Sequence, residues 1–188
     1  MAGTLNLAGF APRSHIYGPG VRFALWVQGC SLHCPGCWNR DTWKFRPRDV
    51  WDVEALAARV LSEPGLEGVT LLGGEPMDQA EQLLPFLERV RSAGLSVMTF
   101  TGYELDELTT PARRAVLERT DLIVTGRYHE AERDTGLRWR GSRNQRVLPL
   151  GPRYAALVLD EANQFEVVLD AEGRMEVRGF PPEWLSRL

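Results

Sequence analysis

Residues 22–37 read RFALWVQGCSLHCPGC, an apolar run that leads into three cysteines, Cys30, Cys34 and Cys37. A short apolar run that ends at a glycine predicts a buried β-strand. Loops that leave the strand ends of an open α/β sheet are where ligands tend to bind. The stretch therefore predicts a strand with a candidate site directly after it.

Similar apolar runs recur along the chain and alternate with helical patterns. Strands are predicted over 22–28, 68–72, 95–100 and 121–125. A first helix is predicted over 53–61, after Asp49 and Asp52. A second helix is predicted after Asp78, with Glu81 completing a capping box, and a third helix is predicted to begin near Pro111. Strands separated by helices imply right-handed crossovers and a parallel sheet. The expected fold class is therefore α/β with a mainly parallel sheet.

The sequence after Arg127 has a different character. It is polar and rich in arginine, and two short runs, 165–170 and 174–178, flank Ala171-Glu172-Gly173 and predict a β-hairpin. We expect this part to be an edge addition or a surface lid and not a second domain.

Composition limits the class of protein. The chain has 188 residues, of which 44% are hydrophobic and 25% charged, and a formal net charge of −3. These values are typical of a globular protein and argue against a disordered chain, a membrane protein and a strongly basic nucleic-acid binder. The N-terminus lacks a signal-peptide pattern and no apolar run reaches the ~18 residues of a membrane span, so we expect a cytoplasmic protein.

The three cysteines fall within eight positions. An odd number cannot pair completely in one chain, and in a reducing compartment clustered thiols are more often metal ligands or redox groups. Three thiolates on one tight loop suit three irons of a cubane cluster and leave the fourth iron open. A zinc site completed by His33, His15 or His129, and chance clustering, remain alternatives.

A second motif, Gly73-Gly74-Glu75-Pro76, follows the second predicted strand. It suits a strand-to-helix turn, and its carboxylate and bare backbone also suit a ligand's ammonium group.

Together, Cys-x3-Cys-x2-Cys and this second motif resemble the radical S-adenosylmethionine (SAM) superfamily. Within it, GPGVRFALWVQGCSLHCPGCWN (18–39), TFTGYEL, DLIVTGRYHE and RGSRNQR are similar to the activating proteins of anaerobic ribonucleotide reductase. The resemblance covers residues 16–146. It implies one radical SAM domain over 1–188, a partial, open (βα) barrel with a C-terminal extension, 147–188, that carries the hairpin.

The resemblance also implies roles for individual residues. Cys30, Cys34 and Cys37 would hold a [4Fe-4S] cluster, and Gly73, Gly74, Glu75 and Pro76 would bind the amino group of SAM. The SAM pocket would further include Trp38, Thr99, Thr101, Thr125, Ser142 and Asn144. The structural alternatives are turn chemistry for the strand-end threonines, a solvated basic loop for Ser142 and Asn144, and plain core packing for Trp38. Many relatives have aspartate at position 125, so this sequence lacks any role which that carboxylate has in them. We expect Trp26 and Trp51 to lie in the core.

The implied activity is reductive cleavage of SAM at the cluster to methionine and a 5′-deoxyadenosyl radical. An external donor such as flavodoxin would supply the electron, and the radical would take a hydrogen atom from a glycine of a large partner enzyme. No side chain has to act as acid or base, and neither membrane nor nucleic acid is an expected partner. The alternatives are a radical SAM enzyme acting on a small molecule, as 7-carboxy-7-deazaguanine synthases do, one acting on another protein or peptide, and a non-catalytic iron–sulfur or zinc protein.

Overall fold

The computed structural model describes residues 3–159 and 162–182. Its strands are β1 (Thr4–Ser14), β2 (Arg22–Val27), β3 (Asp49–Asp52), β4 (Gly68–Gly73), β5 (Ser96–Phe100), β6 (Leu122–Thr125), β7 (Arg146–Pro149), β8 (Phe165–Leu169) and β9 (Met175–Gly179). Its α-helices are α1 (Val53–Leu61), α2 (Ala80–Ser92) and α3 (Pro111–Glu118).

The main sheet has the order β3-β1-β2-β4-β5-β6-β7. The strands β2, β4, β5 and β6 pair in parallel, so their carboxyl ends meet at one edge. These are the four strands predicted from the sequence, and the expected α/β class and parallel arrangement are confirmed for them. The sheet is open, with β3 and β7 at its edges, and the barrel form stays a prediction.

Three further strands, β1, β3 and β7, flank this parallel centre in antiparallel pairings. They were not predicted. In β1, Gly9 and Pro12 interrupt the apolar alternation, and the register shifts beside both positions. The four-residue β3 is largely exposed and has little apolar signal of its own.

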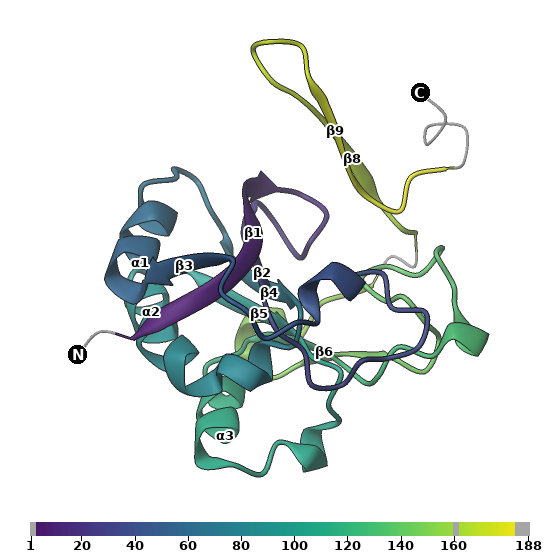
Figure 1. The fold of residues 1–188 in the computed structure, drawn as a ribbon, viewed down its shortest axis with the longest axis horizontal. Helices are drawn as coiled ribbons and strands as arrows, with labels where there is room; N and C mark the ends of the chain where they lie inside the picture. Colours follow the sequence, from purple (N-terminus) through teal and green to yellow (C-terminus); the bar gives the residue numbers. More distant parts are fainter. Residues whose placement is uncertain (1–2, 160–161, 183–188) are drawn as a thin grey trace.

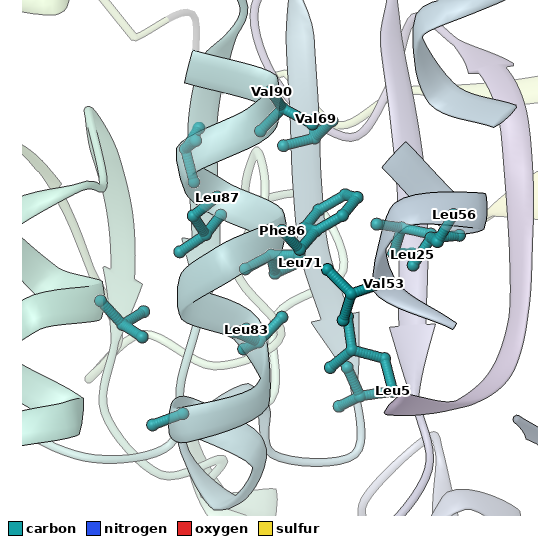
Figure 2. Packing of buried hydrophobic residues seen from close by; sticks show 14 of the residues in the cluster. Leu5, Leu25, Val53, Leu56, Val69, Leu71, Leu83, Phe86, Leu87 and Val90 are labelled. Atoms are coloured by element: carbon teal, nitrogen blue, oxygen red, sulfur yellow. The ribbon is translucent and has the colours of Figure 1, made fainter. Parts of the chain in front are cut away.

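The helices α1, α2 and α3 cover one face of the sheet, with α2 between the other two (Figure 1). The core lies between them and alternate residues of the strands. Figure 2 shows Leu83, Phe86 and Leu87 of α2 packed beside Leu71 of β4, with Val53 of α1 on the other side. Burial of this continuous apolar layer is the main stabilising contribution to the fold.

The start of the second helix differs from the prediction. A 3₁₀ turn, Pro76–Gln79, precedes α2, whose N-cap is Gln79 without a side-chain hydrogen bond. The expected capping box at Asp78 and Glu81 is therefore wrong, because the Asp78 carboxylate is engaged by Ser31 and Arg113 instead. The α1 helix begins as its acidic start predicted, with Asp52 accepting from the Glu54 and Ala55 amides.

The predicted hairpin is present as β8 and β9, which among the described strands pair only with each other. It projects from the main body (Figure 1, top), and Ser14 donates to Glu166 at its base over 2.8 Å. In the part of the chain that the structure describes, no helix has both the length and the apolar character to cross a membrane.

Candidate metal centre and cofactor cavity

The cysteine loop leaves the carboxyl end of β2, as predicted. The Cys30 amide donates to the Trp43 carbonyl at 3.1 Å, and the Cys37 amide donates to the Cys34 carbonyl at 3.1 Å. His33 and Gly36 take positive φ values of 47° and 73°, which turn the loop back on itself. Cys30 is buried, Cys34 and Cys37 are half-buried, and all three are free thiols.

The three thiols line one cavity of about 440 Å³. This volume lies within the range of small-molecule sites. Burial raises the pKa of the Cys30 and Cys34 thiols, so iron that binds here has to displace protons. The donor set is what an iron–sulfur cluster uses, and the sequence has no fourth cysteine.

The zinc alternative depends on a histidine as fourth ligand. His33 lies against the Trp43 ring at 4.9 Å, and His129 Nδ1 lies 3.0 Å from Glu132. None of the histidines of the described chain lines the cavity. Among residues 3–159 and 162–182, no three His, Cys, Asp or Glu side chains are grouped to hold a single metal ion; in a cubane each thiolate binds a different iron.

The second motif brings β4 against β2. A Cβ at Gly73 would lie 2.7 Å from the Trp26 Cα, and one at Gly74 would lie 2.1 Å from the Gly29 carbonyl oxygen. Only glycine permits this approach, which places the turn at the cavity wall. Pro76 is buried and opens the 3₁₀ turn that precedes α2.

Glu75 is the buried carboxylate of the cavity, 2% exposed. Its Oε1 accepts from the Met77 amide at 2.9 Å and from the Thr101 hydroxyl at 2.8 Å, and its Oε2 accepts from the Gly102 amide at 2.8 Å. Burial raises the pKa of Glu75 to about 7, against the opposing effect of these three donors. The residue ties the end of β4 to the end of β5 and can take up or release a proton near neutrality.

Five of the predicted SAM-pocket residues line the cavity together with the cysteines: Trp38, Gly73, Gly74, Glu75 and Thr101. Five do not: Pro76, Thr99, Thr125, Ser142 and Asn144. Thr99 lies on the helix-facing side of β5, where its hydroxyl is 3.0 Å from that of Thr120. Because strand side chains alternate between faces, its neighbour Phe100 is the residue that lines the cavity.

Of the other three polar residues, Ser142 and Asn144 hold the segment 126–145, which contributes to the cavity wall. The Ser142 hydroxyl accepts from the His129 amide at 3.2 Å, and Asn144 donates to the Arg127 carbonyl at 2.8 Å. Within the described structure, the Thr125 hydroxyl and the Asn144 Oδ1 are buried without a hydrogen-bond partner. From this segment, Arg140, Gly141 and Gln145 line the cavity.

Sequence reasoning missed much of the cavity wall. Trp26, Leu72, Phe100 and Val124, one from each parallel strand, form its apolar side. Trp26 was expected in the core; it packs against the small apolar cluster of Ala11, Ala24 and Leu72, and it also lines the cavity. Trp51, by contrast, packs against Phe10 beside the main core, with ring centroids 5.7 Å apart.

The C-terminal part supplies another wall that was not predicted. Asn163, Gln164, Gly179 and Phe180 line the cavity. The Phe180 ring lies 4.6 Å from that of Trp38, the residue after Cys37. No motif marks these residues, because the contact joins distant parts of the sequence.

A polar network outside the cavity fixes the cysteine loop. Asp78 accepts from the Ser31 amide at 2.7 Å and from the Ser31 hydroxyl at 3.0 Å. Arg113 of α3 donates to Asp78 at 3.2 Å and to the Tyr103 hydroxyl at 3.1 Å. Because Ser31 directly follows Cys30, Asp78 in the turn before α2 and Arg113 of α3 help to fix the position of the Cys30 thiol.

A three-cysteine loop at the carboxyl edge of a parallel sheet, beside a glycine-rich acidic turn, is an arrangement that suits an iron–sulfur protein. Residues 16–148 match the family described as a 4Fe-4S single cluster domain. The chain is 35% identical over 149 residues to an anaerobic ribonucleoside-triphosphate reductase-activating protein of Haemophilus influenzae, which covers 75% of this chain and 96% of that protein. The proteins of the same name from Escherichia coli K12 and Enterobacteria phage T4 are each 31% identical, over 76% of this chain and 97% and 93% of their own lengths.

The chain belongs to the 4Fe-4S single cluster domain family and, within it, to the anaerobic ribonucleoside-triphosphate reductase-activating proteins. Among solved structures, QueE from Escherichia coli is similar over 53% of this chain and 52% of its own, with a TM-score of 0.42 and 20% identity.

Proposed function

We propose that this protein is a radical SAM enzyme that activates an anaerobic ribonucleoside-triphosphate reductase by taking a hydrogen atom from a glycine of that partner. The observation that carries the proposal is the meeting of three unpaired thiols and the buried Glu75 carboxylate in one cavity of about 440 Å³. Three thiolates leave one iron of a cubane without a protein ligand, and a cavity of this size suits a ligand such as SAM.

Each part of the cavity then has a role. Cys30, Cys34 and Cys37 hold the [4Fe-4S] cluster, whose bound form supplies the electron that cleaves SAM to a 5′-deoxyadenosyl radical. Glu75 and the backbone of Gly73 and Gly74 receive the ammonium group. Glu75 loses its proton as that positive charge arrives, because a nearby cation lowers the pKa of a carboxyl.

The other predicted residues have two kinds of role. Trp38 and Thr101 line the same space and contact the bound SAM. Ser142 and Asn144 act by holding the segment 126–145 in place over the cavity, and Pro76 fixes the turn that carries Glu75. Thr99 and Thr125 support the strand ends without direct contact with SAM.

The apolar side of the cavity has a protective role. Trp26, Leu72, Phe100 and Val124 exclude water from the space in which a reactive radical would form. The cofactors supply the difficult chemistry, and the protein supplies position and exclusion of solvent. The large substrate is brought by the partner, and a one-electron donor such as flavodoxin reduces the cluster.

The test is anaerobic reconstitution, reduction with dithionite, and assay of 5′-deoxyadenosine from SAM, followed by the same reaction with the partner reductase. We expect nucleoside formation and a glycyl-radical signal in the partner by electron paramagnetic resonance. The Cys34→Ala variant should lose the visible cluster absorbance and at least ~100-fold of the nucleoside yield, because two thiolates do not hold a cubane. A protein with a full cluster that forms no 5′-deoxyadenosine would contradict the proposal, as would an unchanged spectrum in Cys34→Ala.

A further inference from the structure

A basic loop, residues 40–48 (RDTWKFRPR), follows the cysteine loop in the sequence. It carries four cations, Arg40, Lys44, Arg46 and Arg48, and one carboxylate, Asp41, in a chain of net charge −3. All five side chains belong to exposed residues, and with Pro47 they line a hollow of about 530 Å³. The basic loop is therefore a local positive surface on an acidic protein.

Most of this positive charge is not neutralised by neighbouring carboxylates. Arg48 pairs with Asp41 at 3.1 Å, and the Arg40 guanidinium lies over the Trp43 ring at 5.8 Å. Within the described part of the chain, the side chains of Lys44 and Arg46 form no ion pair. Charges left open to solvent in this way attract a surface of opposite sign.

The basic loop is fixed directly against the first cluster ligand. The Gly29 amide donates to the Thr42 carbonyl at 2.7 Å, and the Cys30 amide donates to the Trp43 carbonyl at 3.1 Å. Gln28 donates to the Lys44 carbonyl at 2.7 Å. The Phe45 ring covers Gly29 and is itself 65% exposed. A protein that docks on the basic loop therefore meets an aromatic residue that touches the residue before Cys30.

The charged side chains of the basic loop lie outside the cavity, although Trp43 of the same loop lines it. The hollow at residues 40–48 and the 440 Å³ cavity have no lining residue in common. Lys44 and Arg46 therefore lie outside the cavity into which the partner would insert its glycine. An electron donor has no need to enter the cavity and requires only a close approach to the cluster ligands.

We infer that the basic loop is the docking surface for an acidic one-electron carrier protein of the flavodoxin class. The inference rests on the proposed function. In the transfer, the donor's flavin hydroquinone loses one electron and becomes a semiquinone, the cluster gains that electron and passes from the 2+ to the 1+ state, and no bond forms or breaks. Electron-transfer complexes are small and transient, and charge steering sets their association rates, which suits a patch of this size.

The first test uses the fact that Lys44 is the chain's only lysine. A carbodiimide joins a donor carboxylate to the Lys44 amine as an amide, and the reagent takes up the water. With an acidic flavodoxin as probe, we expect a cross-linked peptide at Lys44 that is lost at high salt. The matched control, Lys44→Arg, keeps the charge and removes the amine, so it should lose the cross-link and keep normal reduction by flavodoxin. No cross-link at Lys44, or one unaffected by Lys44→Arg, overturns the inference.

The second test compares two reductants on the cluster-loaded protein by stopped-flow absorbance. The double variant Lys44→Glu/Arg46→Glu should be reduced by flavodoxin hydroquinone at least ~10-fold more slowly at low salt, and the difference should shrink as salt rises. Dithionite should reduce the variant and the parent at the same rate. Equal rates with flavodoxin overturn the inference, as does a variant that loses only its affinity for the partner reductase, which would assign the basic loop to that enzyme. Failure of SAM cleavage with dithionite would instead contradict the proposed function.

Discussion

Glu75 shows how one buried carboxyl combines structural and chemical roles. It accepts three hydrogen bonds, two of which join the ends of β4 and β5, and its burial still raises its pKa to about 7. A carboxyl with a raised pKa binds its proton more tightly in the folded than in the unfolded state. Its contribution to stability is therefore complete below the unfolded pKa and is lost as the pH rises through the folded pKa.

This gives a pH prediction for the cluster-free protein. As the pH rises from about 4.5 to above 7, the wild type should lose about 3 kcal/mol of unfolding free energy relative to Glu75→Gln, from a shift of ~2.5 units at ~1.4 kcal/mol each. Other titrating groups are common to both proteins and cancel in the difference. Urea unfolding of both proteins in anaerobic buffers between pH 5 and 8 measures how this difference in unfolding free energy changes with pH. A pH-independent difference would show that Glu75 titrates normally.

At the scale of elements, the cysteine loop depends on a helix that shares no motif with it. Arg113 of α3 and the Ser31 amide both bind Asp78, whose side chain is 8% exposed. Removal of that carboxylate leaves a partly buried guanidinium and a backbone amide without their acceptor, which costs free energy.

We therefore predict that Asp78→Ala lowers the unfolding free energy by about 2 kcal/mol. It should also reduce the iron retained after anaerobic gel filtration, because Ser31 no longer fixes the backbone next to Cys30. Chemical unfolding and an iron assay measure the two effects. Asp106→Ala, at an exposed acidic residue of the 3₁₀ turn Leu105–Glu107, is the matched control. If both variants kept the same iron content, Asp78 would have no positioning role.

The comparison of sequence and structure also belongs at this scale. The apolar pattern was sufficient to predict that β2, β4, β5, β6 and the three α-helices exist. Each of these strands is a compact apolar run bounded by a glycine or a turn, and each helix has apolar residues at helical spacing. The pattern did not show which strand residues face the helices and which face the cavity, because strands buried on both sides carry apolar residues at every position. The resemblance placed Thr99 in the pocket where Phe100 lies, and the apolar pattern did not show that Trp26 lines the cavity as well as packing against an apolar cluster. Asp78 was misassigned because a local capping pattern competes with a tertiary partner that sequence spacing does not show.

At the scale of the whole molecule, the site is closed by contacts between distant parts of the chain. Trp139 donates to the Ile16 carbonyl at 2.9 Å, and Phe180 lies against Trp38 with ring centroids 4.6 Å apart. The matched family region ends at residue 148, so the wall from 163 to 180 lies outside it. No short motif predicts such a wall.

We predict that Phe180→Ala weakens SAM binding by ~10-fold, about 1.4 kcal/mol, because the cavity opens beside Trp38 and the cluster ligands. Leu169→Ser, at a 68% exposed position of the hairpin, is the control and should bind SAM normally. Equilibrium dialysis with labelled SAM on the cluster-loaded protein measures both affinities. An unchanged affinity in Phe180→Ala would show that this wall does not take part in binding.

The order in which these walls are made has a consequence during synthesis. The chain leaves the ribosome from its N-terminus, so β2 and the cysteine loop emerge well before Phe180. Until the last strand pair is released, the space beside Cys37 lacks its C-terminal wall. During that interval the cysteine loop is covered by less of the chain than in the finished molecule, where Phe180 lies against Trp38.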